Sequence, residues 1–189
     1  MIRIITFLSS LLLLAHIVFA QPDAFKAGTE PDGFRGIKWG THISALNDMT
    51  KVWEDGNRTF YERKGESLEI GGAKLHKIIY VFWKDRLLEV RVAILKDYGP
   101  DRDELANFNI IKDICFDKFG EQKKPFFGKE QYSWFGGRTW MYLGYEDPGF
   151  LRLIVGSIEL LKQKKAEDEI KAKQEEVSRK QKVREARGF

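Results

Sequence analysis

The sequence predicts an α+β fold, in which an antiparallel sheet carries one main helix on a face and a charged helix follows at the C-terminus. Three observations predict it. Residues 75–83 and 87–95 are rich in β-branched and aromatic residues and flank a short polar turn, which is typical of a β-hairpin. Apolar residues recur at helical spacing between Leu105 and Phe119. From Ser157 onward, helix-forming Lys, Glu, Gln, Arg and Ala dominate the chain.

Residues 1–20 have the three-part pattern of a cleavable signal peptide. Arg3 precedes an apolar run, and Val18-Phe19-Ala20 provides a cleavage triplet before Gln21. The alternative is a retained anchor, because a run of this length could just cross a hydrocarbon core about 30 Å thick. Two serines and a histidine dilute the run, and Pro22 disfavours continuation of the helix. We therefore expect a periplasmic or secreted protein.

The mature chain is expected to contain a mobile leader at 21–32, an α+β domain at 33–156 and a charged helical tail at 157–189. The formal net charge of the chain is +4. It is concentrated in the tail, where ten Lys and Arg stand against six Asp and Glu from Lys162 onward. Since the domain itself is close to neutral, a broad nucleic-acid footprint on it is not expected, and export makes nucleic acid an unsuitable partner.

The first half of the domain is predicted to begin with a short strand at 34–39. Thr41 then resembles a helix N-cap, because Ile43, Leu46 and Met49 follow at three-residue spacing. A strand is expected at 59–70, ended by Gly71-Gly72. The hairpin of 75–83 and 87–95 around Lys84-Asp85-Arg86 follows it.

The second half is predicted to open with a helix that starts near Asp101 and stops at Gly120. Its buried side should carry Leu105, Phe108, Ile111, Cys115 and Phe119. A second hairpin, 131–135 and 138–145, surrounds Gly136-Gly137, a pair suited to the positive φ angles of a two-residue turn. A last strand covers 151–155. A helix followed by three strands would then occur twice, which suggests a pseudo-duplicated unit.

Alternation of side chains along the hairpins predicts which residues share a face. In the first hairpin the expected core face carries Ile79, Val81, Leu88, Val90 and Val92, and the opposite face carries Ile78, Tyr80, Phe82, Glu89 and Arg91. In the second hairpin the expected core face carries Tyr132, Trp134, Thr139, Met141 and Leu143, and the opposite face carries Phe135, Arg138, Trp140 and Tyr142. Aromatic residues on both faces exceed what a sheet with one wet face needs.

Two interpretations of the second face remain open. Either another helix or the tail covers it, or it is a binding platform for a protein, glycan or apolar ligand. On the second interpretation the binding residues would be Tyr80, Phe82, Phe135, Arg138, Trp140 and Tyr142.

No linear motif for catalysis, metal or cofactor binding stands out in the sequence. His42 and His76 lack the spacing of metal ligands. The acidic residues around 97–104 lack the spacing of a calcium loop and fit the start of a helix. Cys115, the only cysteine, is expected to be buried as a small hydrophobe. We therefore expect no cofactor, no metal and no catalytic residue that the sequence alone could identify.

The segment Phe34-Arg35-Gly36-Ile37-Lys38-Trp39-Gly40-Thr41 resembles the opening motif of a group of small exported bacterial proteins. Lys118-Phe119-Gly120, followed by Trp134 and Gly137, is similar to their second half. The resemblance implies export and carries no activity. The helix-then-three-strands order is also similar to envelope domains of the BamE and β-lactamase-inhibitor type, a likeness of architecture alone.

The tail has four Glu-to-Lys or Glu-to-Arg pairs at i, i+4 spacing, which favours a long solvated helix. It is either an exposed extension or a basic arm for peripheral contact with anionic surfaces. The expected function is a non-enzymatic envelope protein that binds a protein or envelope component through its aromatic sheet face. The alternative is an exported hydrolase whose carboxylates are brought together by the fold, since separated Asp and Glu leave no linear signature.

Overall fold

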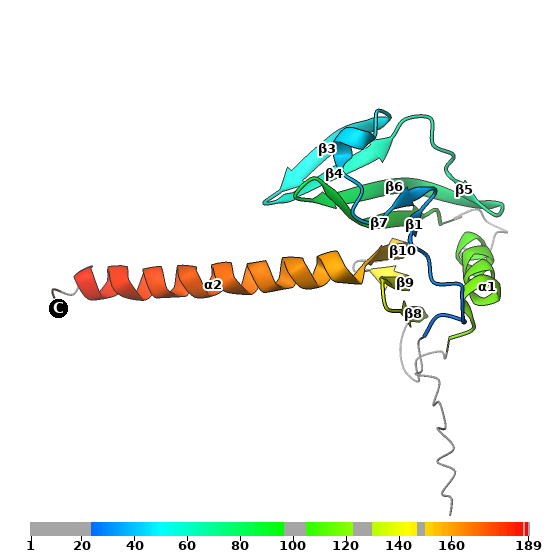
Figure 1. Cartoon of the computed structure of the whole chain (residues 1–189). Coiled ribbons are helices and arrows are strands. Elements are labelled where there is room, and N and C mark those ends of the chain that lie inside the picture. Colours follow the sequence, from blue (N-terminus) through cyan, green and yellow to red (C-terminus); the bar gives the residue numbers. More distant parts are fainter. Residues whose placement is uncertain (1–23, 97–104, 123–129, 147–149, 187, 189) are drawn as a thin grey trace, which may run out of the picture.

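The structure, a computed structural model, is built on one antiparallel sheet of eight strands (Figure 1). It describes residues 24–96, 105–122, 130–146, 150–186 and 188. The predicted signal peptide and the predicted helix start at Asp101 lie outside these residues. The elements are β1 (Gly33–Phe34), β2 (Ile37–Lys38), the 3₁₀ helix η1 (Ile43–Ala45), β3 (Met49–Asp55), β4 (Arg58–Arg63), β5 (Glu69–Ile70), β6 (Ala73–Trp83), β7 (Arg86–Ile94), α1 (Ala106–Phe119), β8 (Gln131–Phe135), β9 (Thr139–Glu146), β10 (Phe150–Ser157) and α2 (Ile158–Ala186).

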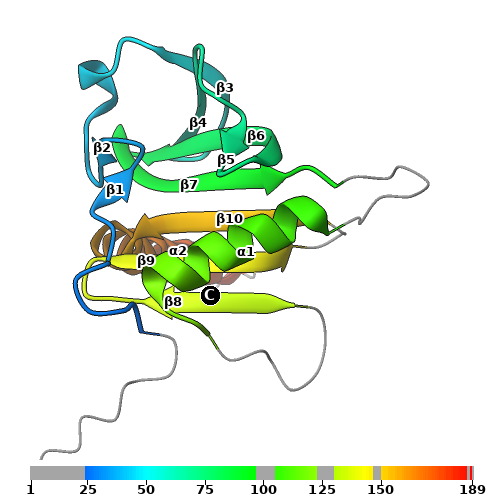
Figure 2. The same ribbon diagram turned by 90° about the vertical axis from the view of Figure 1, so that its right-hand side faces the viewer.

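The strand order β3-β4-β6-β7-β10-β9-β8 joins the two halves of the chain through β7 and β10, and β5 pairs with β6 beside this path. Helix α1 packs on one face of the sheet, which we call the inner face, and α2 leaves on the other side, the outer face (Figures 1 and 2). The main core lies between α1 and the inner face. The predicted α+β class, with an antiparallel sheet, one main helix and a helical tail, is confirmed.

The β6–β7 hairpin is confirmed, but the predicted assignment of its residues to the two faces of the sheet is wrong. Its two-residue turn, Lys84-Asp85, has positive φ angles of 48° and 60°. Beyond the turn a β-bulge intervenes, because Phe82 pairs with Leu87 while Val81 already pairs with Glu89. The extra residue in β7 shifts the alternation of one strand relative to the other by one residue.

As a result, each side chain of β6 named in the prediction lies on the opposite face of the sheet from the one that the alternation predicts. The inner face of the hairpin carries Ile78, Tyr80 and Phe82 together with Val90 and Val92, and of these only the two valines were expected there. The outer face carries Ile79, Val81, Leu88, Glu89 and Arg91.

The β8–β9 hairpin is also confirmed, and here the predicted faces are correct. Tyr132 and Trp134 pair with Leu143 and Met141, and all four belong to the main core. The register differs by two residues from the expected one, because Gly136 N–H donates to the carbonyl of Thr139. The turn therefore falls on residues 137–138, and neither glycine of the expected turn has a positive φ. A shift of two residues preserves the alternation, so the faces stay the same.

The start of the domain differs from the prediction. Instead of one strand at 34–39, β1 and β2 form a tight hairpin around Arg35 and Gly36, which have φ angles of 47° and 83°. Only η1 follows, capped by the His42 ring, which accepts the N–H of Ser44 at 3.2 Å. The expected helical turns around Met49 are strand β3.

The expected strand at 59–70 is divided into β4 and β5. Strand β3 pairs with β4 across the turn at Gly56 and Asn57. In the described part of the chain, the first half therefore contributes four long strands after a 3₁₀ turn, whereas the second half contributes three strands after α1. The two halves do not repeat the same unit.

The described part of the predicted mobile leader, residues 24–32, is attached to the domain, which corrects that expectation. Ala24 forms a parallel bridge with Phe135, and Lys26 N–H donates to the carbonyl of Phe119 at 2.6 Å. The Glu30 carboxylate accepts the backbone N–H groups of residues 138 and 139 at 2.5 and 2.7 Å. Through these hydrogen bonds, the segment 24–32 holds the β8–β9 turn in place.

The hydrogen bonds from the backbone N–H groups of residues 138 and 139 to Glu30, which we call the Glu30 clamp, predict that the stability of the domain depends on pH. Burial by itself would raise the pKa of Glu30, but the backbone N–H groups and the Arg138 charge outweigh it and hold the pKa below its usual value of 4.5. The clamp's contribution is therefore fully present above the unfolded-state pKa and is lost as the pH falls through the lower folded-state pKa. Urea unfolding of wild type and Glu30→Gln from pH 7 to pH 3 should show their stability difference shrinking on acidification. A constant difference would contradict the clamp.

Helices α1 and α2 match their predictions where the structure describes them. Phe108, Ile111 and Cys115 are buried on α1, and Gly120 ends the helix with a φ of 99°. Ser157 caps the start of α2, since its Oγ accepts the N–H of Leu160, three residues further along, at 3.2 Å. The predicted tail thus begins as a helix directly after the last strand.

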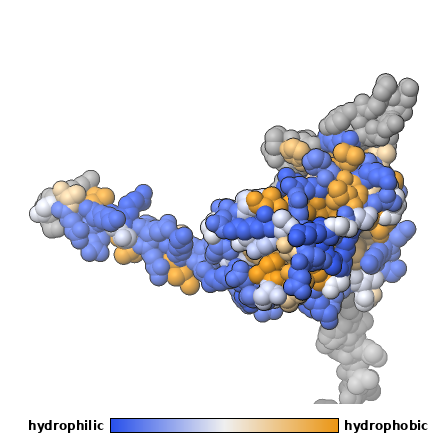
Figure 3. All heavy atoms as spheres, turned by 90° about the horizontal axis from the view of Figure 1, so that it is seen from above, coloured by the Kyte–Doolittle hydropathy of each residue, from blue (hydrophilic) through white to orange (hydrophobic). Residues whose placement is uncertain are grey.

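The first turns of α2 are anchored and the rest projects from the domain. Leu160 is buried against Trp83 on the outer face, and further along Glu167 forms an ion pair with Lys84 and a hydrogen bond with Asn57. Beyond Glu167 the helix is exposed, and Figure 3 shows it as a hydrophilic rod with isolated hydrophobic residues. Within the described ranges, no helix is both long enough and apolar enough to cross a membrane.

Candidate functional site: the outer sheet face

The structure separates the six residues predicted to bind into two groups. Tyr80 and Phe82 are fully buried on the inner face, as a consequence of the bulge in β7. They cannot present a side chain to a partner on the outer face. The other four lie around β8 and β9: Phe135, Trp140 and Tyr142 on the outer face, with Arg138 exposed in the turn between these strands.

Trp140 and Tyr142 lie against glycines of the sheet. A Cβ atom on Gly156 would be 2.8 Å from Trp140 Nε1, and one on Gly144 would be 2.8 Å from the Tyr142 hydroxyl. The missing side chains leave room for these aromatic groups over the strands, and both residues are half-buried. The Tyr142 hydroxyl donates to the carbonyl of Tyr145 at 2.6 Å.

Two exposed phenylalanines border these residues. Phe135 pairs with Trp140 across the β8–β9 ladder and is 56% exposed, and Phe150 at the start of β10 is 53% exposed. The guanidinium of Arg152 lies 5.7 Å from the centre of the Phe150 ring. We call the set Phe135, Trp140, Tyr142, Phe150 and Arg152 the aromatic platform. Sequence reasoning missed Phe150 because it predicts the last strand only from residue 151.

The other half of the outer face is closed by its own side chains. Trp53 stacks on Phe60 with ring centres 4.0 Å apart, and the Arg58 and Arg91 guanidinium groups lie 5.6 and 5.9 Å from the Phe60 ring centre. Phe60 is therefore buried without a covering helix, while Trp53 stays partly exposed at the sheet edge. This half offers less accessible aromatic surface than the platform.

Two indole groups on the outer face have N–H donors without a protein acceptor. Trp83 Nε1 and Trp140 Nε1 are buried atoms that form no hydrogen bond with any described residue. A buried donor without an acceptor is costly. Both tryptophans lie near the root of α2, since Trp83 packs on Leu160 and Trp140 pairs with Gly156.

The described carboxyl groups give no support to the hydrolase alternative. A general acid would need a carboxyl pKa raised by burial or by a like charge. Where a shift is resolved for a described Asp or Glu, it is downward, as for Asp48, whose pKa is lowered chiefly by its hydrogen bond from Arg63. Nearby, Glu66 pairs with Arg35 at 3.0 Å and accepts the Tyr80 hydroxyl, and this contact anchors the β1–β2 hairpin.

Metal ligands do not gather in the part of the chain that the structure describes. No three His, Cys, Asp or Glu side chains lie close enough there to hold an ion. His42 caps η1, and His76 is exposed on β6. Cys115 is buried, and burial raises its pKa to about 12. The acidic residues at 97–104 lie outside the described ranges.

No protein-family model, curated protein or solved structure matches this chain.

Proposed function

We propose that this chain is a non-enzymatic protein of the cell envelope, or a secreted one, that binds a protein or envelope component through the aromatic platform. The observation that carries the proposal is the position of the platform. The strand registers place its rings on the sheet face opposite α1, and two of them, Phe135 and Phe150, are more than half exposed. Exposed aromatic groups on one sheet face mark candidate interaction surfaces, and aromatic and Arg side chains dominate binding energies at such surfaces.

The place of action rests on the signal pattern at residues 1–20. Helix α2 supports a role beside a surface. Its 29 residues correspond to about 44 Å of helix, and five basic residues stand against one acidic residue between Arg179 and Arg187. We propose that this end makes peripheral contact with anionic surfaces.

The experiment is capture from the native envelope fraction by full-length protein, with intact mass showing whether the mature chain begins at Gln21. The test variant is Phe135→Ser combined with Phe150→Ser. Both side chains are exposed, so the fold should be retained while specific capture is lost. The matched control is Leu68→Ser combined with Ile110→Ser, which removes two exposed aliphatic side chains elsewhere.

The proposal requires that the platform variant lose partners that wild type and the control variant both retain. If the platform variant captures the same partners as wild type with equal yield, the platform is not the binding surface. A mature chain that still begins at Met1 would contradict export by cleavage.

A further inference from the structure

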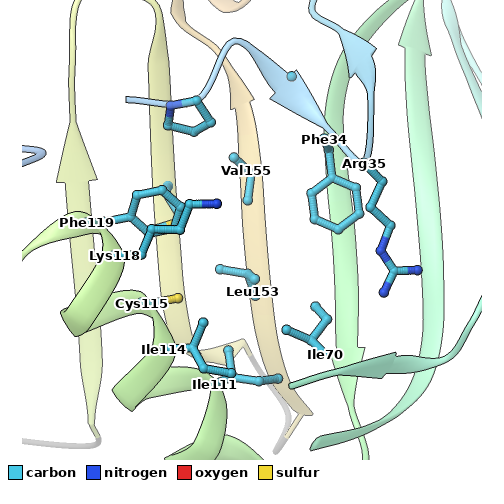
Figure 4. Close-up of a pocket in the computed structure, with 13 residues that line it drawn as sticks. Phe34, Arg35, Ile70, Ile111, Ile114, Cys115, Lys118, Phe119, Leu153 and Val155 are labelled. Atoms are coloured by element: carbon cyan, nitrogen blue, oxygen red, sulfur yellow. The ribbon is translucent and has the colours of Figure 1, made fainter. Parts of the chain in front are cut away.

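A second feature, separate from the platform, lies on the other side of the sheet. A pocket of about 340 Å³ opens between α1, the β1–β2 hairpin and β5 (Figure 4). Leu153 and Val155 of β10 form its floor, Ile111 and Ile114 of α1 form one wall, and the Phe34 ring lies opposite them. Its volume falls at the lower end of the range of about 300–1,000 Å³ that is usual for small-molecule sites.

The pocket exists because two separately anchored elements flank β10. On one side, Arg35 donates to the carbonyls of Ser67 and Glu69 at 2.7 and 2.8 Å, which holds the β1–β2 hairpin beside β5. On the other side, α1 is held by its buried residues Phe108 and Ile111. Neither element reaches across the gap.

The pocket is open to solvent rather than enclosed in the core, and most of the residues that line it are apolar. Its aliphatic walls offer water few hydrogen bonds, so an apolar ligand gains free energy by displacing water from them. The body of a ligand for this pocket should therefore be aliphatic.

The charged lining residues define the polar end of the ligand. There are two, Arg35 and Lys118, and both are cations. The Arg35 guanidinium turns away from the pocket towards its carbonyl and Glu66 partners. Lys118 is exposed at the end of α1, with its ammonium 5.2 Å from the centre of the Phe119 ring. Among the described residues, no carboxylate forms an ion pair with Lys118.

We propose that this pocket binds a linear aliphatic carboxylate of medium chain length. The chain lies on Leu153 and Val155 beside Ile114, and the carboxylate pairs with the Lys118 ammonium. Charge complementarity selects the anion, because acidic groups are absent from the described lining. The small volume favours a single unbranched chain over a bulky ring system.

The test uses decanoate, decanol and decylammonium as probes, each below its aggregation concentration, with the full-length protein purified without detergent. Titration calorimetry and thermal unfolding measure binding, since a ligand of the native state raises the unfolding midpoint. Decanoate should bind most tightly. Lys118→Gln should weaken decanoate by about two- to fivefold, to the level of decanol, because one partly screened ion pair is lost.

A pocket-filling variant tests the place of binding. Ile114→Trp should abolish binding of decanoate, while the control Ile110→Trp, on the exposed side of the same helix, should leave it unchanged. Lys118→Glu should reverse the preference from decanoate to decylammonium. Since Lys118 is exposed, its variants remain informative even where Ile114→Trp fails to fold.

Failure of decanoate to bind wild type would overturn the proposal. Equal binding of all three probes, or binding by Lys118→Gln that matches wild type, would overturn the carboxylate assignment. These outcomes are independent of the platform variants, so the two proposals can fail separately.

Discussion

Trp134→Ala is expected to lower the free energy of unfolding by about 3–5 kcal/mol, the usual cost of removing a buried large aromatic side chain. Trp134 has no exposed surface and packs edge-on to the Phe116 ring of α1, with ring centres 6.1 Å apart. Its Nε1 donates to the carbonyl of Gly120 at 2.8 Å. The variant therefore leaves a cavity beneath α1 and removes the shorter of the two side-chain hydrogen bonds to the Gly120 carbonyl. Urea unfolding followed by circular dichroism measures the loss.

The control is the next residue along β8. Phe135 points to the outer face and is more than half exposed, so Phe135→Ala should change stability by about 1 kcal/mol or less. Equal losses for the two variants would show that both faces of β8 are core, and the platform proposal would then have to be withdrawn.

Gly156→Val is expected to destabilise the domain by about 1–3 kcal/mol through overpacking. A Cβ atom on Gly156 would lie 2.8 Å from Trp140 Nε1 and 2.9 Å from Glu89 Cβ. The Trp140 ring can move aside, but Glu89 Cβ is attached to the neighbouring strand β7 and cannot move without it. Thermal and urea unfolding measure the loss.

Two further variants separate this clash from a general effect of replacing glycine. Gly137→Ala, in the β8–β9 turn, meets no atom within 4 Å and should be nearly neutral. In the Trp140→Ala background, Gly156→Val should cost less than in wild type, because one of the clashing groups has gone. Additive losses would mean that Trp140 does not lie over Gly156.

Local patterns accounted for the elements that depend on near neighbours in the sequence. The β6–β7 hairpin followed from two β-branched runs around a polar turn, α1 from apolar spacing that ends at Gly120, and α2 from its helix-forming residues. Each leaves its pattern within a short stretch of sequence, so the composition and spacing of a short window are informative. The faces of β8 and β9 were also correct, because the error in register was an even number of residues.

Long-range contacts explain the errors. Strand β3 has helical spacing of apolar residues nearby, yet it pairs with β4, and tertiary pairing overrides such a weak local preference. The leader at 24–32 has few apolar residues, but Glu30 finds two backbone donors at residues 138 and 139, far along the chain. Neither partner is recognisable from the local sequence.

The sequence by itself determined the fold class, the main hairpins, both long helices and the presence of more aromatic residues than one core face requires. Only the tertiary structure decided which aromatics are exposed. One extra residue in β7, Leu88, shifts the register of β6 against β7 by one residue. Because such a shift moves every side chain of a strand to the other face, Tyr80 and Phe82 point into the core. The pairing of β10 with β9 then places Phe150 and Arg152 on the outer face, a position that depends on strand order and not on local pattern.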